Sequence, residues 1–404
     1  MSKIDELIQQ YCPDGVENVR LSDICIKVCS GGTPSRSNSS YFNGNIPWLR
    51  TQEVDWKDVS DTEIKITEEA VLNSSAKLIP ENCVIVAMYG ATAGKACINK
   101  IPLTTNQACC NLQIDPQKAA YRYVYYWVCH EYENIKSLGQ GSQNNINAQI
   151  VKDYIIPLPP LPIQEEIVRV LDTFTELQAE LQAELQARQL QCQYYRDQLF
   201  AFDGRNDIKW KKLGDVASIT TGRRFVRTDI KESGVPCIHY GDIYTYYGLT
   251  TTKTKGYLDA ELASKLRFAH PNDVVVVCAG ENDMDLGIGV AWLGDEPAVV
   301  HDACCILHHE QNPRYISHFL RTHKYHLQMK RYAKNGKISS LASSALAEAI
   351  IPIPSLEEQE KIATILDRFD NLVNDLSQGL PAEMEARRHQ YEYYRDKLLT
   401  FKRI

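Results

Sequence analysis

Arginine, serine, threonine and asparagine residues gather in a few glycine-containing stretches of this 404-residue chain. One stretch reads GGTPSRSNSSYFNGN (31–45), and another reads TTGRRFVRTD (220–229). Guanidinium, hydroxyl and amide groups of these kinds bond phosphate oxygens and the edges of nucleic-acid bases. The chemistry that these stretches could perform is therefore the recognition of a nucleic acid.

Two further pairs of segments offer similar side chains. WLRTQEV (48–54) has a counterpart in CIHYGDIYTYYG (237–248), and GQGSQNNIN (139–147) has one in NGKISS (335–340). Taken singly, most of these residues could simply be solvated loop residues, but as a set they indicate different reading groups on one shared scaffold. The candidate DNA-binding residues are Thr33, Ser35, Arg36, Arg50, Thr51, Gln52, Tyr89, Lys95, Gln143, Asn144, Arg223, Arg224, Arg227, His239, Tyr240, Tyr244, Tyr246, Lys337 and Ser339.

No arrangement of residues points to catalysis or to a metal centre. GATAGKAC (90–97) resembles a phosphate-binding loop, but it has one residue too few before the lysine and an alanine where a Mg²⁺-binding serine or threonine belongs. The ten histidines and thirteen cysteines show no zinc-site spacing, and the cysteines are interpreted as reduced core residues. We therefore expect a binding protein with no catalytic residues, and with no metal or cofactor of its own.

Charge is distributed unevenly along the chain, although the net charge of −7 argues mildly against bulk nucleic-acid binding. Residues 18–150 carry 12 basic and 12 acidic side chains, and residues 205–350 carry 19 and 16. Residues 156–202 carry 3 and 7, and residues 351–404 carry 8 and 10. The neutral or basic segments are suited to contact with DNA, and the acidic ones to contact with protein.

These segments belong to a unit of about 195 residues that the chain contains twice. The clearest matches are IIPLPPLPIQEEIVRVLDTF (155–174) with IIPIPSLEEQEKIATILDRF (350–369), and YYRD at 194–197 with YYRD at 393–396. Ala-Cys-Cys also recurs, beginning at residue 108 and again at residue 303. Two copies are too few for a solenoid, so the sequence predicts a pseudo-two-fold molecule.

Each copy begins with a globule of mixed secondary structure. CVIVAMYG (83–90) and VVVVCAG (274–280) are short apolar runs between turn residues, which is typical of buried strands. Residues 121–135 and 313–329 are rich in aromatic side chains and predict helices. Each globule is therefore expected to be an α+β domain of about 140 residues.

Each copy ends in a long helix with an apolar stripe. Two independent surface helices would satisfy this pattern, but stripes of this length are better explained by packing on each other as a coiled coil. ELQAELQAELQA (176–187) favours helix in the first copy, whereas Gly379 and Pro381 predict a break in the second. The stripe residues are Ile167, Val170, Leu171, Phe174, Leu177, Leu181 and Leu185, then Ile362, Ile365, Leu366, Phe369, Leu372, Val373 and Leu376.

The N-terminal residues imitate the end of such a helix. LIQQYCPDGVENVRLSDI (7–24) enters the first globule as QLFAFDGRNDIKWKKLGDV (198–216) enters the second, so both termini should lie at the same end of the coiled coil. The N-terminus has acidic residues and no apolar core, unlike a signal peptide. No apolar run reaches the 18 residues or so of a membrane span. We expect a cytoplasmic protein with no membrane partner.

The order of globules and helices, with IPLPPLPIQEEIVRVLDTF before YYRDQL and IPIPSLEEQEKIATILDRFD before YYRDKL, resembles the specificity subunit of type I restriction–modification enzymes over essentially the full length. The resemblance implies two target-recognition domains, each reading one half of a bipartite asymmetric DNA site, and an antiparallel coiled coil that sets their spacing. It also implies a non-catalytic chain. Its partners would be double-stranded DNA, two adenine-methylating subunits and nuclease/translocase subunits, which would use S-adenosylmethionine, ATP and Mg²⁺.

On this interpretation the chain has two recognition domains and two spacer helices. A rival interpretation is a stand-alone DNA-binding scaffold or regulator built on the same repeat, and co-purification of a methyltransferase would separate the two. The expected divisions are 1–155 for the first recognition domain with a short N-terminal helix, 156–203 for the first spacer helix, 204–350 for the second recognition domain and 351–404 for the second spacer helix.

Overall fold

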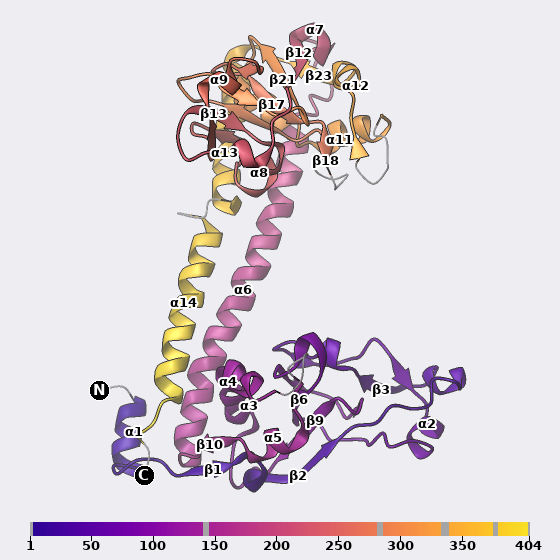
Figure 1. Cartoon of the computed structure of the whole chain (residues 1–404), viewed down its shortest axis with the longest axis vertical. Helices are drawn as coiled ribbons and strands as arrows, with labels where there is room; N and C mark the ends of the chain where they lie inside the picture. Colours follow the sequence, from indigo (N-terminus) through magenta and orange to yellow (C-terminus); the bar gives the residue numbers. More distant parts are fainter. Residues whose placement is uncertain (1–2, 140–144, 281–285, 333–338, 375–378, 403–404) are drawn as a thin grey trace. The chain divides into compact units, whose positions relative to one another are not determined.

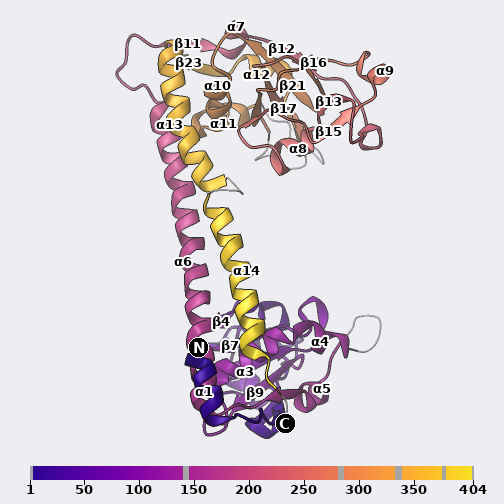
Figure 2. The ribbon, with the colours of Figure 1, turned by 90° about the vertical axis from the view of Figure 1, so that its left-hand side faces the viewer.

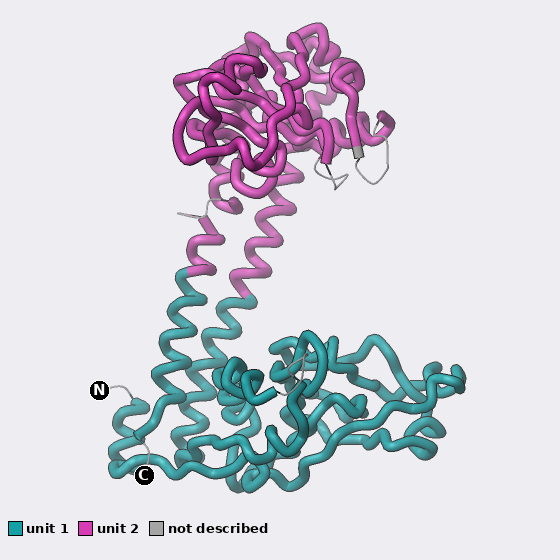
Figure 3. Tube along the Cα trace, viewed as in Figure 1, with its two compact units in different colours: residues 1–179, 386–404 teal, residues 180–385 magenta. Residues whose placement is uncertain are grey.

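The computed structural model describes residues 3–139, 145–280, 286–332, 339–374 and 379–402. The chain divides into two compact units, which Figure 3 colours separately. Unit 1 comprises residues 1–179 and 386–404, and unit 2 comprises residues 180–385. Each unit contains one globule and parts of both helical regions, because the long helices contribute residues to both. The four-part division by sequence stays a prediction.

A five-stranded sheet forms the centre of the globule in unit 1, in the order β2-β9-β6-β7-β4. Neighbouring strands are antiparallel except β4 and β7. The buried strand predicted within residues 83–90 is confirmed as β6: alternate residues of β6 enter two different hydrophobic clusters, so both faces of the sheet are covered. The strands are β2 (Cys25–Ser30), β4 (Asp58–Val59), β6 (Val84–Ala87), β7 (Ala96–Asn99) and β9 (Cys109–Ile114).

Smaller sheets and helices complete unit 1, and α3 packs against β6 and β7 (Figure 1). A three-stranded sheet has the order β5-β3-β8 and comprises β3 (Ile46–Leu49), β5 (Lys65–Ile66) and β8 (Thr104–Thr105). A two-stranded sheet comprises β1 (Asn18–Arg20) and β10 (Ile155–Pro157). The α-helices are α1 (Lys3–Tyr11), α2 (Glu68–Leu72), α3 (Tyr121–His130), α4 (Tyr132–Ser137) and α5 (Ala148–Asp153). The 3₁₀ helices are η1 (Leu21–Ile24), η2 (Ser39–Phe42), η3 (Thr51–Glu53) and η4 (Gly90–Thr92).

Unit 2 repeats the central sheet of unit 1 strand for strand, which confirms the predicted repeat, although its second sheet has four strands instead of three and a further pair, β18 and β22, is added. Its central sheet has the order β12-β21-β17-β19-β14, again with one parallel pair, β14 and β19. These strands are β12 (Ala217–Thr221), β14 (Thr250–Thr251), β17 (Val274–Val277), β19 (Gly289–Trp292) and β21 (Cys304–His309). The smaller sheets comprise β15 (Gly256–Leu258), β13 (Val235–Ile238), β20 (Ala298–Val300) and β16 (Phe268–Ala269); β11 (Lys209–Lys212) and β23 (Ile350–Ile353); and β18 (Ala279–Gly280) and β22 (Ser339–Ser340).

The predicted aromatic helices are each two helices. Residues 121–135 form α3 and the start of α4, and residues 313–329 form α10 (Pro313–Phe319) and most of α11 (His323–Lys330). The first helix of each pair is held in the same way: the Tyr123 hydroxyl donates to the Pro157 carbonyl at 2.8 Å, and the Tyr315 hydroxyl donates to the Pro352 carbonyl at 2.9 Å. The remaining helices of this globule are α7 (Leu213–Val216), η5 (Arg227–Asp229), α8 (Tyr240–Thr245), α9 (Ala260–Ala263) and α12 (Ser343–Ala347).

The two spacer regions differ in continuity. The first is one helix of 39 residues, α6 (Leu161–Leu199), and includes the ELQA repeats. The second comprises α13 (Leu356–Asn374) and α14 (Leu380–Leu399), so the predicted break near Gly379 and Pro381 is confirmed. Pro381 lies in the first turn of α14, where the missing N–H of proline costs no helical hydrogen bond.

Aromatic side chains join the two spacer regions in both units. In unit 1, the ring of Phe174 on α6 stacks on Tyr394 of α14 with centroids 5.5 Å apart. In unit 2, Tyr195 of α6 stacks on Phe369 of α13 at 5.2 Å. The second tyrosine of each YYRD therefore stacks on the phenylalanine of the opposite spacer, as an antiparallel coiled coil requires. Two members of the predicted apolar stripe, Ile365 and Leu372, are exposed and not covered, and a third, Leu376, lies outside the described residues.

The residues after each YYRD explain why the motif occurs twice. Phe200, at the end of α6, is buried in one cluster with Ile362 and Leu366 of α13. Leu399, at the end of α14, is buried in one cluster with Ile163 and Ile167 of α6. Each motif thus ends a spacer helix and inserts the following residues into a globule's core.

The N-terminal segment and the end of α14 lie side by side in unit 1, as predicted (Figure 2). The backbone N–H of Val16 donates to the carbonyl of Lys402 at 2.9 Å. Ile4 of α1 also shares a hydrophobic cluster with Leu399. No helix among the described residues combines the length and the apolar composition of a membrane-spanning segment.

Candidate nucleic-acid interface

In unit 1, several candidate residues surround the turn before β9. Asn106 holds this turn, because its Oδ1 accepts a hydrogen bond from the Ala108 N–H at 3.1 Å while its own N–H donates to the Leu49 carbonyl at 2.9 Å. The next residue, Gln107, is exposed, and its Oε1 accepts a hydrogen bond from the Thr33 hydroxyl. The loop after β2, the end of β3 and the turn before β9 thus meet at one surface.

The segment after β3 adds further polar groups to this surface. Arg50, Thr51 and Gln52 follow β3 directly, and the Thr92 hydroxyl donates to the Thr51 carbonyl at 2.8 Å. This bond joins η3 to η4, whose N-cap residue is the exposed Tyr89. Candidate residues from the loop after β2, the segment after β3 and the segment around η4 therefore lie together near the turn before β9.

Two of the cations on this surface are already paired with carboxylates. The Arg50 guanidinium donates to Glu53 at 3.2 Å and also pairs with Glu63. The Lys95 ammonium pairs with Asp55 at 2.6 Å. Amides and hydroxyls are therefore the groups most available for a ligand here.

A cavity of about 410 Å³ occupies the equivalent place in unit 2. His239 and Tyr240 follow β13 there as Arg50 and Thr51 follow β3. The cavity brings the loop after β12, the end of β13, β18 and the turn before β21 together. Its lining residues are Arg224, Phe225, Val226, Arg227, His239, Tyr240, Ala279, Gly280, His301, Asp302 and Ala303.

Two histidines in ring contact form one wall of this cavity. The rings of His239 and His301 lie 4.6 Å apart, and His239 lies 4.5 Å from Tyr240. Burial lowers the pKa of His239 to about 4 and also lowers the pKa of His301, so both rings are neutral at neutral pH. Their Nδ1 atoms accept backbone hydrogen bonds from Gly241 and Ala303, which leaves each Nε2–H as a donor.

The arginines of unit 2 fall into two groups. Arg223 donates to the Lys265 carbonyl at 2.7 Å, which fixes it within the globule. Arg224 and Arg227 are exposed, and among the described residues no side-chain hydrogen bond or ion pair engages either guanidinium. These two cations are therefore available for a phosphate or a base edge.

Other candidate residues lie outside these two surfaces or at their margins. Ser35 and Arg36 are exposed in the loop after β2, where the Ser35 hydroxyl bonds that of Ser37 at 2.7 Å. Tyr246 is exposed and packs near Lys255 rather than in the cavity. Tyr244 lies at the margin of the cavity, with its ring centroid 6.4 Å from that of Tyr240.

The third predicted pair of reading segments is only partly described. Ser339 lies in β22, which pairs with β18 beside the cavity through Gly280. Gln143, Asn144 and Lys337 lie outside the described residues.

The structure adds residues that sequence reasoning missed, chiefly Gln107, His301 and Asp302. A signal for them exists in the repeat itself. The framework triplet Ala-Cys-Cys is preceded by Asn106-Gln107 in one copy and by His301-Asp302 in the other. A variable pair beside an invariant triplet is what an exchangeable contact on a fixed scaffold would produce.

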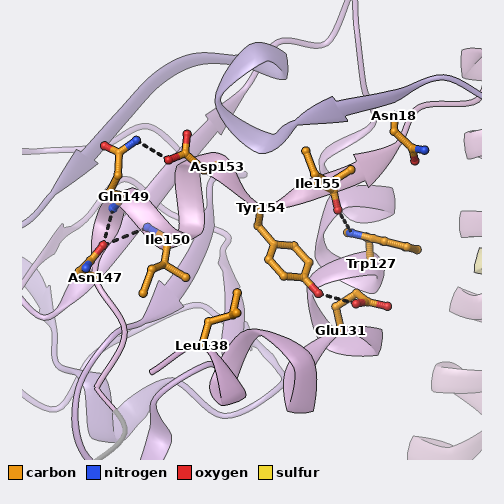
Figure 4. A pocket seen from close by; sticks show the side chains of 10 residues that line it. All are labelled: Asn18, Trp127, Glu131, Leu138, Asn147, Gln149, Ile150, Asp153, Tyr154 and Ile155. Carbon is orange, nitrogen blue, oxygen red and sulfur yellow. Dashed lines mark hydrogen bonds between the residues drawn. The ribbon is translucent and has the colours of Figure 1, made fainter. Parts of the chain in front are cut away.

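A separate cavity of about 730 Å³ in unit 1 is lined by none of the candidate residues (Figure 4). Its polar groups bond one another: the Trp127 Nε1–H donates to the Ile155 carbonyl at 3.1 Å, and the Tyr154 hydroxyl donates to Glu131. We therefore do not include it in the candidate interface. In the described ranges no cluster of histidine, cysteine, aspartate or glutamate is arranged to hold a metal ion.

The family model described as type I restriction modification DNA specificity domain matches residues 13–188 and again 206–386. The chain is 33% identical over 299 residues to the specificity subunit of the type I restriction enzyme EcoR124I/EcoR124II from Escherichia coli, covering 71% of this chain and 72% of the relative. It is 30% identical over 308 residues to a putative type I specificity subunit from Haemophilus influenzae, covering 70% and 73%.

Solved structures share the fold at lower identity. A chain from a structure described as "Structural basis underlying complex assembly and conformational transition of the type I R-M system" superposes with a TM-score of 0.67 at 17% identity, covering 96% of this chain and 98% of that one. The type I S subunit from M. genitalium gives a TM-score of 0.53 at 15% identity, covering 95% and 96%.

Proposed function

The chain belongs to the type I restriction–modification specificity family, as a non-catalytic specificity subunit with two DNA-recognition domains, and we propose that each domain reads one half of a bipartite, asymmetric DNA site. The domain of unit 1 is called recognition domain 1 below, and that of unit 2 recognition domain 2. Specific half-sites would be bound in the major groove through base edges, with arginines also contacting phosphates.

One observation carries this proposal. Equivalent strand ends in the two domains gather equivalent reading segments, but the side chains differ: Arg50 and Thr51 in one domain stand where His239 and Tyr240 stand in the other. Equal scaffolds with unequal polar groups are suited to two different half-sites. Duplicated enzymatic sites would instead repeat the same chemical groups.

The spacer helices would set the distance between the half-sites. Each ELQA unit adds about 6 Å of helix and about 40° beyond a full turn. One base pair of DNA advances about 3.4 Å and turns about 34–36°. The tripled repeat of α6 would therefore contribute directly to the number of unread base pairs.

The proposed partners follow from the specificity family. Two methyltransferase subunits would dock on the spacer helices, which are the acidic part of the chain, and nuclease/translocase subunits would complete the enzyme. S-adenosylmethionine, ATP and Mg²⁺ would be bound by those subunits and not by this chain.

Mapping of methylated adenines in cells that produce the complete system tests the proposal. We expect one bipartite motif with a fixed gap. Replacement of residues 18–150 by the corresponding segment of another specificity subunit should change one half of the motif and leave the other half and the gap unchanged. A single continuous motif, or an unchanged one after the exchange, would contradict the two-reader model.

Deletion of one ELQA unit tests the role of the spacer. The gap should shorten by one or two base pairs while both half-site sequences persist, because the reading surfaces are untouched. The matched control is a Gln-to-Ala change at Gln182, which alters one repeat without altering helix length. An unchanged gap in the deletion variant would contradict the spacing role.

A further inference from the structure

The turns before β9 and β21 have the same backbone in both recognition domains. The Asn106 N–H donates to Leu49 at 2.9 Å, and the His301 N–H donates to Ile238 at 3.2 Å. A backbone hydrogen bond between residues three apart closes each turn. The Cys109 N–H donates to the Asn106 carbonyl at 3.2 Å, and the Cys304 N–H donates to the His301 carbonyl at 3.0 Å.

Different side chains perform the same capping task in these turns. Asn106 Oδ1 accepts from the Ala108 N–H at 3.1 Å, and His301 Nδ1 accepts from the Ala303 N–H at the same distance. The residue between cap and donor, Gln107 or Asp302, is left exposed at the tip in both domains. Gln107 and Asp302 are thus equivalent positions on equivalent backbones.

The loop after the first strand of each central sheet approaches the tip in the same way. The Gly32 N–H donates to Thr105 at 2.8 Å, and the Arg223 N–H donates to Val300 at 3.0 Å. The following residues are therefore equivalent too, Thr33 in domain 1 and Arg224 in domain 2. Each tip residue consequently has one polar neighbour from this loop.

In domain 1 this neighbour orients an amide. The Thr33 hydroxyl donates to Gln107 Oε1, which leaves a second lone pair on that oxygen and directs the NH₂ group away from the hydroxyl. An exposed amide that offers one acceptor and one donor side by side matches the N6 and N7 groups of adenine.

In domain 2 the same two positions hold a carboxylate and a guanidinium. Asp302 and Arg224 line one cavity. A carboxylate accepts from the N4 amino group of cytosine, and a guanidinium donates to O6 and N7 of guanine. The pair therefore matches a C·G base pair and mismatches A·T, which offers no equivalent acceptor pair to arginine.

We propose that Gln107 and Asp302 are equivalent specificity-determining residues. Gln107, positioned by Thr33, reads an adenine in one half-site, and Asp302 with Arg224 reads a C·G base pair in the other. This inference rests on the proposed function and adds the base identity at one position of each half-site.

The test uses the assembled complex and the variants Gln107→Asp and Asp302→Gln, which exchange the two tip residues. Methylated adenines are mapped in cells. In parallel, the purified complex is incubated with a randomised DNA library and the bound DNA is sequenced, so that base preference can be measured even for a variant that no longer methylates. Each variant should change preference at one position of one half-site by about ten- to a hundredfold, with the other half-site unchanged.

Matched controls lie at the opposite ends of the same strands. Gln117→Asp, beyond β9, and Glu310→Gln, beyond β21, change exposed residues of similar chemistry and should leave the motif intact. Thr33→Val removes the orienting hydroxyl and should weaken discrimination for adenine without selecting a new base. A purely structural role of Thr33 would instead weaken binding to all sequences alike.

Three outcomes separate this inference from the function on which it rests. If Gln107→Asp and Asp302→Gln bind DNA with every base preference unchanged, the assignment of these residues is wrong while the two-reader function stands. If the wild-type motif contains no adenine in the half-site of domain 1, or no C·G pair in that of domain 2, the base assignment is wrong. If the wild-type complex has no bipartite motif, the proposed function itself fails.

Discussion

Each unit has a junction between its recognition domain and a spacer helix. One set of contacts at this junction is the same in both units, and a neighbouring set differs. In unit 1, Asp172 of α6 bonds Arg122 at 2.6 Å and the Tyr126 hydroxyl at 2.5 Å. In unit 2, Asp367 of α13 bonds Arg314 and, at 2.9 Å, His318. The repeat thus preserves the contact that orients each domain on its helix.

The second half of each junction differs in charge. In unit 2, the largely buried Arg196 pairs with Asp370 at 3.6 Å, and the partly buried Arg321 donates to the Gly248 carbonyl at 2.9 Å. Burial lowers the pKa of Arg321 to about 10, because removal from water disfavours the charged guanidinium.

Unit 1 places smaller or uncharged groups at the corresponding positions. Cys129 replaces Arg321, and Thr175 replaces Asp370. Arg395 replaces Arg196 but bonds the adjacent Asp396 and lies over the ring of Tyr391. A cavity of about 630 Å³ remains at this junction, and five of its twelve lining residues are aromatic. Beyond the orienting contact that both units share, unit 1 therefore secures its domain by packing, and unit 2 by buried charges.

The largest difference is expected when the carboxylate of unit 2 is removed. Asp370→Ala leaves Arg196 and Arg321 without their nearby negative charge, and should cost about 3 kcal/mol of unfolding free energy in unit 2. Thr175→Ala, the matched change in unit 1, should cost about 0.5 kcal/mol or less, since Thr175 is exposed. Amide hydrogen exchange measured for each unit checks both values. Equal losses in the two units would contradict the contrast between the junctions.

A smaller loss of stability, equal in the two units, is expected when the tyrosine–phenylalanine stacks that both units share are removed. Tyr195→Ala and Tyr394→Ala each remove a ring stacked on the opposite spacer, and double-mutant cycles with Phe369 and Phe174 should give coupling of about 0.5–1.5 kcal/mol.

The preceding tyrosines serve as internal controls for these stacks. Tyr194 and Tyr393 are the more exposed members of each pair, and their replacement by alanine should cost less in denaturant unfolding. Coupling in one unit but not in the other would show that the stacks are not equivalent.

The smallest effect concerns pH at a single position. Burial lowers the pKa of His318, which faces Asp367, Asp370 and Arg196, so its folded-state value lies below the ordinary value of about 6.5. As pH falls below about 6.5, His318 binds a proton in the unfolded chain but not in the folded chain, so unit 2 loses stability.

The change His318→Tyr installs the residue that unit 1 has at this place, Tyr126, and should reduce the loss of unit 2 stability between pH 7.5 and pH 5.5. Four other histidines of unit 2 share the lowered pKa and will retain part of the response: His239, His301, His309 and His326. Exchange rates of unit 1 in the same sample provide the control. An unchanged acid response in the variant would contradict a contribution from His318.

Most of the fold could be predicted because the repeat and the periodicities are local properties of the chain. Apolar runs marked β6 and β17, and the stripe from Ile167 marked α6. The break between α3 and α4 could not be predicted, because the aromatic pattern continues through Glu131, where the helix ends and a new one begins.

The residue types of the candidate site could be predicted from the sequence, but not which of those side chains are free to contact a ligand. Loops rich in Arg, Ser, Thr and Asn did gather at equivalent strand ends. Arg50 and Lys95, however, are paired with Glu63 and Asp55, and a carboxylate distant in sequence cannot be assigned to a cation before the fold is known. Gln107 was missed because the hydrogen bond that orients its amide comes from Thr33, which is 74 residues away in the sequence.

The sequence by itself determined that one α+β unit occurs twice, that long helices separate the copies and that YYRD closes each helix, because these follow from composition and spacing along the chain. Only the tertiary structure decided which tyrosine stacks on which phenylalanine, which cations remain free and which tip residues stand on the same turn. Those outcomes depend on groups that burial and strand pairing bring together from distant positions, and their energies of desolvation and hydrogen bonding exist only in the folded chain.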